Sequence, residues 1–327
     1  MTMNNYAKAR AHTNIALVKY WGKRNAALKL PTTNSLSLTL DQFYTDTSVQ
    51  FDDHLTSDQV TLNNHRLDEP AARRVTDFLN IVRNQAGITT KAIVKTTNNV
   101  PTAAGLASSA SGFAALAAAA SKASGLTLNQ RELSRLARRG SGSATRSIDG
   151  GFVEWHKGIG DRTSFATQVA PADYWDLNVI AILVNQQPKK MSSSEGMQLS
   201  QTTSPYYHEW EKLCQRDLKK LKIAIKNRNF NDLGTIAEEN AMRMHALTLS
   251  AAPDFCYFDA DSLKAMRLVH QLRESGIPCY FTMDAGPNVK VLVEPEHRES
   301  VVSTLQAAFG PDHIVVAAPG PGVQYFR

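Results

Sequence analysis

The sequence predicts an α+β protein organised as two domains. Its 327 residues are more than one small hydrophobic core usually contains. Residues 35–40 alternate strictly between polar and apolar side chains, which is typical of a half-buried strand. In the second half, helical and strand-like segments alternate, which favours a sheet with helices on one face. We therefore expect one domain over residues 1–180 and a second over residues 181–327, with the boundary between Pro171 and Pro188.

Strand patterns dominate the first part of the chain. Further strands are expected at 7–20, 45–51, 59–62, 92–96 and 152–155, and a helix is expected at 69–85. Asn63-Asn64 follows one of these strands and is typical of a hairpin turn. Two more helices are expected at 109–124 and 128–139, and Asn129 is suited to cap the second of them.

The second part of the chain mixes helical and apolar strand patterns. A strong apolar run at 177–184 predicts a central strand. Helices are expected at 206–226, 230–244, 261–275 and 297–309, and further strands at 279–283, 289–293 and 314–317. The segment from Asp284 to Asn288 contains Gly and Pro and is expected to be the turn between two of these strands.

The composition excludes several classes of protein. The net charge of +6 comes from 36 basic and 30 acidic residues, with the basic residues scattered, so it predicts no nucleic-acid surface but suits small anionic ligands. Cys214, Cys256 and Cys279 lack CxxC spacing, which argues against a disulfide framework or a zinc site. The sequence shows no signal pattern and no apolar run of membrane-spanning length, so we expect a cytoplasmic protein without a membrane partner.

Residues 100–112 form a loop of small residues between an expected strand and an expected helix. Small side chains let the backbone approach an anion closely, and the helix start offers free N–H groups and the positive end of its dipole. Ser108, Ser109 and Ser111 add hydroxyls for phosphate oxygens or a metal ion. The loop lacks the Gly-Lys-Ser/Thr ending of a Walker A motif. The alternative interpretation is a small-residue turn that opens a packed, Ala-rich helix.

This loop resembles the Pro-x-x-x-Gly-Leu-x-Ser-Ser-Ala motif of the GHMP kinase superfamily. The resemblance implies the GHMP kinase fold, with an N-terminal domain of the ribosomal-protein-S5-like domain 2 type and a C-terminal ferredoxin-like α/β sandwich. The ligand cleft is then expected between the two domains, and ATP with Mg²⁺ is expected at the loop. The residues expected to contact the nucleotide are Pro101, Ala103, Ala104, Gly105, Leu106, Ala107, Ser108, Ser109 and Ser111, with Ser108 also the expected metal ligand.

Five further segments resemble the diphosphomevalonate decarboxylase family within that superfamily. They are AHTNIALVKYWGK at 11–23, NSLSLTL at 34–40, SRLARRGSGSA at 134–144, SSSEGM at 192–197 and MDAGPNVK at 283–290. The resemblance implies a carboxy-lyase of the mevalonate pathway of isoprenoid biosynthesis. Such an enzyme converts mevalonate 5-diphosphate and ATP into isopentenyl diphosphate, ADP, phosphate and carbon dioxide. The family also implies a homodimer.

A substrate with a diphosphate and a carboxylate requires fixed cations. Lys19 and Lys23 lie in the first segment, and Arg146 can clamp a carboxylate or phosphate with two parallel hydrogen bonds. Arg74 matches the family's diphosphate-contacting Arg, with the neighbouring Arg73 as an alternative. The residues expected around the substrate are Tyr20, Trp21, Gly22, Lys23, Arg74, Ser141, Gly142, Ser143, Ala144, Thr145, Arg146, Ser193 and Ser194. The Ser193-Ser194 pair also suits a plain turn.

Asp284 is the residue expected to carry the chemistry, together with Lys19, Arg146 and Ser143. It follows an apolar strand and opens a tight turn, so a rigid element positions its carboxylate; the alternative is a turn-capping Asp. The family implies that this carboxylate contacts the substrate's 3-hydroxyl as a base or as an orienting group. Ser143 stands where the kinases of the superfamily have their catalytic Asp, which disfavours a sugar or homoserine kinase.

Two positions depart from the family pattern, and several alternatives stay open. The family commonly has Cys at Thr145 and an aromatic or apolar residue at Asp149, whose carboxylate is expected to pair with a local Arg or to point to solvent. A phosphomevalonate decarboxylase or a mevalonate 3-kinase would differ in the anion pocket. A non-catalytic ligand sensor would be indicated by loss of Asp284 or the loop serines, and neither is lost.

Overall fold

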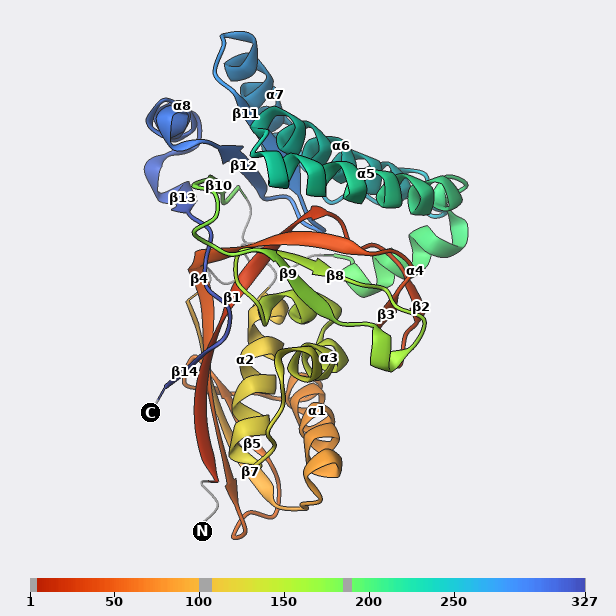
Figure 1. Ribbon diagram of the computed structural model, residues 1–327, viewed down its shortest axis with the longest axis vertical. Coiled ribbons are helices and arrows are strands. Elements are labelled where there is room, and N and C mark those ends of the chain that lie inside the picture. Colours follow the sequence, from red (N-terminus) through yellow and green to blue (C-terminus); the bar gives the residue numbers. More distant parts are fainter. Residues whose placement is uncertain (1–4, 100–107, 185–189, 327) are drawn as a thin grey trace.

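The computed structural model describes residues 5–99, 108–184 and 190–326. It is an α+β structure with a large sheet at one end and a smaller, four-stranded sheet at the other (Figure 1). The large sheet carries helices α1–α3, and helices α5–α8 accompany the smaller sheet (Figure 1). The predicted fold class is therefore confirmed. In the part of the chain that the structure describes, no helix is both long and apolar enough to cross a membrane.

The large sheet has the strand order β14-β1-β4-β7-β5-β6, and β8 joins β4 and is followed by β9. Its strands are β1 (Tyr6–Val18), β4 (Ser35–Asp52), β5 (Gln59–Leu62), β6 (His65–Arg66), β7 (Lys91–Asn99), β8 (Phe152–Trp155), β9 (Ala166–Ala170) and β14 (Gln324–Phe326). A separate short hairpin consists of β2 (Lys23–Asn25) and β3 (Leu30–Pro31). The expected turn at Asn63-Asn64 is confirmed, because both residues adopt positive φ angles of 50° and 65°.

One strand prediction was wrong. Residues 35–40 and 45–51 were expected as two strands, but β4 runs through both as a single strand of 18 residues. The intervening residues 41–44 contain no Gly or Pro and keep an alternating pattern in which Phe43 is buried. The strand is continuous, but its register with β1 shifts here, because Asn14 pairs with Thr39 and His12 with Tyr44, so residues 40–43 form a bulge in β4.

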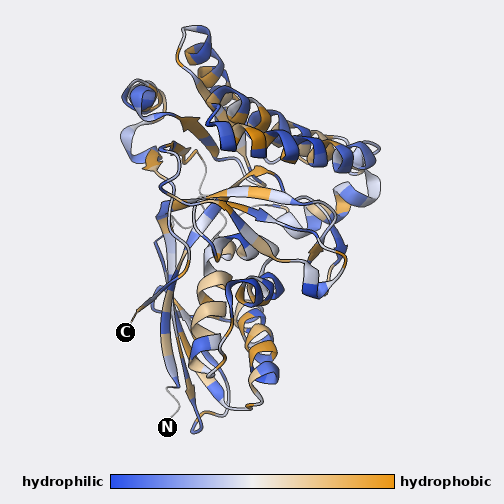
Figure 2. Ribbon diagram, in the orientation of Figure 1, coloured by the Kyte–Doolittle hydropathy of each residue, from blue (hydrophilic) through white to orange (hydrophobic). Residues whose placement is uncertain are grey.

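Three helices cover the large sheet: α1 (Ala71–Ala86), α2 (Ser108–Ala123) and α3 (Gln130–Gly140). Helix α2 packs on β1 and β4 through a run of fully buried alanines, and Figure 2 shows it pale orange along most of its length. The predicted cap of α3 is confirmed: the Asn129 side chain accepts from the Glu132 amide, and the Glu132 carboxylate accepts from the Asn129 amide. Such a capping box contributes about 1 kcal/mol to helix stability.

The smaller sheet is antiparallel with the order β11-β12-β10-β13. Its strands are β10 (Asn178–Ile182), β11 (Cys279–Met283), β12 (Val289–Val293) and β13 (Ile314–Ala317), and its helices are α5 (Tyr207–Asn227), α6 (Phe230–Leu249), α7 (Ala260–Glu274) and α8 (Arg298–Phe309). These elements agree with the predicted ones. Helix α4 (Ser193–Thr203) was not predicted, although Ser192 and Glu195 form a capping box at its start.

The two sheets are connected by more than one crossing of the chain. Strand β14 near the C-terminal end returns to pair with β1, and one buried cluster contains Leu17 and Trp21 beside Trp210 of α5. The predicted division at residue 180 would fall inside β10. It stays a prediction.

Candidate active site

A buried ion pair joins the two sheets. Lys19 follows the end of β1, and Asp284 follows the end of β11, so each group is positioned by the strand before it. The Lys19 ammonium donates to Asp284 Oδ1 over 2.9 Å and to the carbonyl of Ala16 over 2.7 Å. The Lys19 amide donates to the Asn240 side chain of α6 over 2.8 Å. The predicted residues Lys19 and Asp284, 265 positions apart, therefore meet in space.

The cations around Asp284 keep its carboxyl ionised. Burial on its own would raise the pKa of Asp284, but Lys19, Lys290 and Arg146 outweigh this effect and lower the pKa to about 2. The Lys19 side chain is only 1% exposed, whereas Asp284 keeps 25% of its side chain exposed. The carboxylate is thus deeply set yet open to a ligand on one side. Burial lowers the pKa of Lys19, and Asp284 opposes that shift.

Arg146 lies in the 3₁₀ helix Gly142–Ser147 and is almost fully buried. Its Nη1 donates to Ser35 Oγ over 2.6 Å, and its Nε donates to Asn14 Oδ1 over 3.3 Å. Burial lowers the pKa of Arg146 to about 10, while the nearby Asp284 carboxylate and Tyr20 raise it. The guanidinium is therefore fixed near Asp284 with neutral partners, so its charge is available to an anionic ligand.

Asn14 is a site residue that the sequence reasoning missed. Its Oδ1 accepts from Arg146 Nε, and its Nδ2 donates to the Ser143 carbonyl over 3.1 Å and to Ser147 Oγ over 2.8 Å. It thereby ties β1 to the 3₁₀ helix that carries Arg146. A polar residue at a buried position within a strand was the available signal.

The predicted residues Tyr20, Trp21 and Gly22 take different places. The Tyr20 ring packs edge-on against Trp155 with centroids 4.7 Å apart, and its buried hydroxyl has no partner among the described residues. Trp21 is 1% exposed, and its carbonyl accepts from Tyr207 and from α5's Trp210. Gly22 has φ of 119°, and a Cβ there would lie 1.6 Å from the Tyr207 hydroxyl. Trp21 and Gly22 are thus packed against α5 inside the core, and their predicted contact with the substrate stays a prediction.

The turn between α3 and Arg146 provides two hydroxyl groups and brings the backbone close to the Tyr20 ring. Ser141 and Ser143 are half-buried, with their Oγ atoms 3.2 Å apart. Gly142 is required by packing, because a Cβ there would lie 2.8 Å from the Tyr20 ring and hydroxyl. Ala144 and Thr145 are fully buried, so neither offers surface to a substrate in this arrangement, and their predicted contact stays untested.

Lys23 contacts helix α4 at two points. The Lys23 ammonium donates to Ser194 Oγ, and its amide donates to Gln201 over 3.1 Å. Ser193 and Ser194 are the first residues of α4, so they form a helix start rather than a plain turn. Arg74 on α1 is exposed and lies 5.4 Å above the Phe113 ring. The neighbouring Arg73 is exposed as well.

The centre of the predicted nucleotide loop, residues 100–107, lies outside the described residues. The predicted contacts Pro101, Ala103, Ala104, Gly105, Leu106 and Ala107 therefore cannot be placed. Ser108 begins α2, and the exposed Ser109 accepts from Ser141 Oγ over 3.5 Å. Ser111 is fully buried, its Oγ 2.8 Å from Thr45 Oγ1. The helix start is thus beside the Ser141 turn, and Ser111 anchors it to the sheet.

Asp149 follows the 3₁₀ helix Gly142–Ser147 and makes no ion pair within the described chain. Burial raises its pKa. A raised pKa means that the folded state loses stability as pH rises through the ordinary Asp range, because the folded protein must ionise a half-buried carboxyl. We expect Asp149→Asn to raise the melting temperature at pH 7 and to change it little at pH 4. Thermal unfolding at both pH values tests this, and an equal shift at the two would contradict it.

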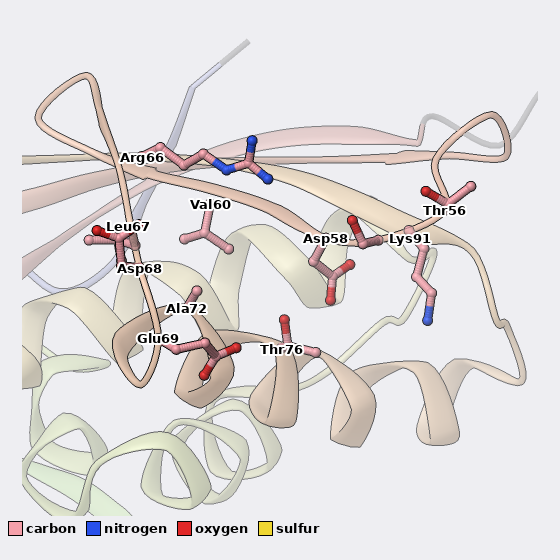
Figure 3. A pocket seen from close by; sticks show the side chains of 11 residues that line it. Thr56, Asp58, Val60, Arg66, Leu67, Asp68, Glu69, Ala72, Thr76 and Lys91 are labelled. Carbon is pink, nitrogen blue, oxygen red and sulfur yellow. The ribbon is translucent and has the colours of Figure 1, made fainter.

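A separate cavity of about 700 Å³ lies between the β5–β6 hairpin and α1. Figure 3 shows that Asp58, Asp68, Glu69, Arg66 and Lys91 are among the side chains around it. None of the candidate residues described above lines this cavity.

Comparison with known proteins adds to this geometry. The diphosphomevalonate decarboxylase-like N-terminal domain family matches residues 11–166, and the mevalonate 5-diphosphate decarboxylase C-terminal domain family matches residues 179–319. The human diphosphomevalonate decarboxylase is 34% identical, over 92% of this chain and 80% of its own length.

Solved structures agree with these matches. The mevalonate diphosphate decarboxylase of Enterococcus faecalis is 51% identical, with a TM-score of 0.93 over 98% of this chain and 99% of its own. A structure of MDDEF in complex with MVAPP, AMPPCP and magnesium is 52% identical, with a TM-score of 0.95 over the same shares. The chain therefore belongs to the diphosphomevalonate decarboxylase family and has its GHMP kinase fold.

Proposed function

We propose that this chain catalyses the ATP-dependent decarboxylation of (R)-5-diphosphomevalonate to isopentenyl diphosphate, ADP, phosphate and carbon dioxide. The observation that carries the proposal is the Lys19–Asp284 pair, with Arg146 close enough to influence both pKa values. It places one ionised carboxylate and two cations where the sheets meet. Ser143, in place of the kinases' catalytic Asp, lies in the same turn as Arg146.

The first proposed step transfers the γ-phosphoryl group of ATP to the tertiary 3-hydroxyl. The hydroxyl oxygen forms a bond to γ-phosphorus while the bond to the ADP oxygen breaks, and the hydroxyl proton leaves late, to a phosphate oxygen or to water. A carboxylate with a pKa of about 2 is a weak base, so Asp284 mainly orients the hydroxyl by accepting its hydrogen bond. The loose transition state of phosphoryl transfer requires little proton transfer, which makes positioning the larger contribution.

The second proposed step eliminates the 3-phosphate and carbon dioxide. The C3–O bond breaks with its electron pair leaving on phosphate, and the C1–C2 bond supplies the pair that forms the C2–C3 double bond. Arg146 would hold the carboxylate that becomes carbon dioxide. Its hydrogen bonds to Ser35 and Asn14 fix the guanidinium before the substrate arrives, which lowers the entropic cost of alignment.

ATP and Mg²⁺ are proposed at the start of α2. The hydroxyls of Ser109 and Ser141 lie there beside a helix N-terminus, which is a suitable environment for phosphate. Mg²⁺ prefers oxygen ligands, and Ser108 is its proposed protein ligand. When bound, the ion offsets negative charge on the phosphates. The family membership also supports the proposals of a homodimer and of a cytoplasmic enzyme.

Parallel assays with three substrates test the function. Mevalonate 5-diphosphate, mevalonate 5-phosphate and mevalonate are each supplied with ATP and Mg²⁺, and ADP and carbon dioxide are both measured. We expect equal amounts of the two products from the diphosphate and far slower turnover of the others. Preferred decarboxylation of the monophosphate, or ADP without carbon dioxide from mevalonate, would overturn the assignment in favour of the two related activities.

A further inference from the structure

Lys29 occupies an unusual position at the edge of the site. It lies in the turn of the hairpin formed by β2 and β3, with a left-handed φ of 50° that residues other than Gly and Asn seldom adopt. Its side chain is half-buried, and its ammonium donates to the Arg139 carbonyl over 2.6 Å. The hairpin is thereby tied to the end of α3, two residues before Ser141.

Lys29 is one of four cations that come together from three elements. Lys23 lies on the same hairpin, Arg139 lies at the end of α3, and Arg74 reaches over the Phe113 ring from α1. Phe113 packs against Gly140, where an added Cβ would lie 2.1 Å from the ring. Arg74 is therefore held beside the same end of α3.

These four cations have no carboxylate among them. Within the described residues, none of Lys23, Lys29, Arg74 and Arg139 forms an ion pair, and the buried Nε of Arg139 has no hydrogen-bond partner. Four like charges at close quarters repel one another and lower the stability of the fold. A bound multivalent anion would relieve this repulsion.

We propose that Lys29 and Arg139 bind the 5-diphosphate of the substrate together with Lys23 and Arg74. The inference deepens the proposed function and rests on it, because it assigns two further residues to the same substrate. Four cations from three elements match the charge of a diphosphate better than that of a monophosphate. Lys29 would therefore contribute to the preference for the diphosphate.

The charges on this group imply that the site takes up a proton when the substrate binds. Burial, together with the nearby charges of Arg74, Lys23 and Arg139, lowers the pKa of Lys29 to about 8. Near pH 8 the free enzyme therefore holds Lys29 only partly protonated, and a bound diphosphate raises its pKa again. Burial also lowers the pKa of Lys23, which adds to the uptake at higher pH. Affinity should fall as pH rises through about 8.

The test compares Lys29→Met with Lys29→Arg. Titration calorimetry with mevalonate 5-diphosphate near pH 8, in buffers of different ionisation enthalpy, measures the protons taken up. We expect Lys29→Met to raise KM and Kd about tenfold with a smaller change in kcat. Lys29→Arg should keep the affinity but lose most of the proton uptake, because Arg stays charged at this pH.

A matched control is Lys219→Met on the exposed face of α5, which removes the same charge from the surface. It should leave KM and the proton uptake unchanged. Melting temperatures establish that each variant is folded. If Lys29→Met does not fold, Lys29→Arg alone still tests the inference through its proton uptake. Wild-type affinity and unchanged proton uptake in both Lys29 variants would overturn the inference. Failure of the wild-type enzyme to turn over mevalonate 5-diphosphate would instead overturn the proposed function.

Discussion

Replacement of Asp284 by Asn is expected to lower kcat about 10³-fold while changing the KM for mevalonate 5-diphosphate only slightly. The amide is nearly isosteric, so the turn after β11 should keep its shape. It presents no negative charge to Lys19 and Arg146, and its neutral oxygen accepts the hydrogen bond of the 3-hydroxyl more weakly than a carboxylate does. Measurement of kcat and KM, with ADP and carbon dioxide followed separately, checks both parts of the expectation.

The matched control is Asp46→Asn. Asp46 also accepts from a cation, with Oδ1 2.7 Å from Arg10 Nε, and its side chain is 18% exposed. This variant should lose a comparable ion pair and leave kcat unchanged. Near-normal turnover in Asp284→Asn would contradict the role assigned to Asp284. An equal loss in Asp46→Asn would show that the effect reflects folding.

The cations around Asp284 also determine how kcat of the wild-type enzyme should depend on pH. Because the pKa of Asp284 is lowered to about 2, the carboxylate is ionised at pH values well above 2. Asp284 should therefore contribute no acid limb to kcat above about pH 4. The family resemblance left two roles open for Asp284, a base or an orienting group for the 3-hydroxyl. The low pKa favours the orienting group, because an efficient proton acceptor cannot be so weak a base.

The regular elements of this fold were largely predictable because they follow from local patterns. The capping box at Asn129 and the turn at Asn63-Asn64 each depend on a few neighbouring residues, and both were read correctly. The break expected within β4 was wrong because the polar pair Asp41-Gln42 looks like an interruption locally, whereas β4 passes through it as a bulge between two stretches that pair with β1. Long-range strand pairing is not visible in a short window of sequence.

Site residues were predictable where they belong to a recognisable sequence motif. They were not predictable where their role depends on a partner far away in the sequence. Lys19 and Asp284 were each placed in a quoted segment, and the structure brings them together. Asn14 lies in such a segment too, but its role depends on Arg146, 132 positions away. Lys29 gains its significance from the Arg139 carbonyl, 110 positions away. Such residues look like ordinary strand or turn positions until the chain is folded.

Replacement of Lys19 by Met is expected to lower kcat about 10²-fold and to bring the acid limb of the pH profile into view. Lys19 is the largest cationic influence on Asp284, so its removal leaves burial to raise the pKa of that carboxyl. More of the enzyme then carries a protonated, inactive Asp284 as pH falls, so kcat should decline toward low pH in this variant. The pH dependence of kcat in the variant and the wild type measures the shift.

A double variant separates the action of Lys19 through Asp284 from an independent contact with the substrate. If Lys19 acts by holding and charging Asp284, then Lys19→Met combined with Asp284→Asn should be no slower than Asp284→Asn alone. The double variant should also be more stable than Lys19→Met. Lys19→Met by itself leaves a deeply set carboxylate with fewer cations around it, which lowers the free energy of unfolding by up to about 3 kcal/mol. If the losses of kcat in the two single variants multiply in the double variant, Lys19 contacts the reacting phosphoryl group directly. Its ammonium already donates to the Ala16 carbonyl and to Asp284, so it would have to change hydrogen-bond partners to make that contact.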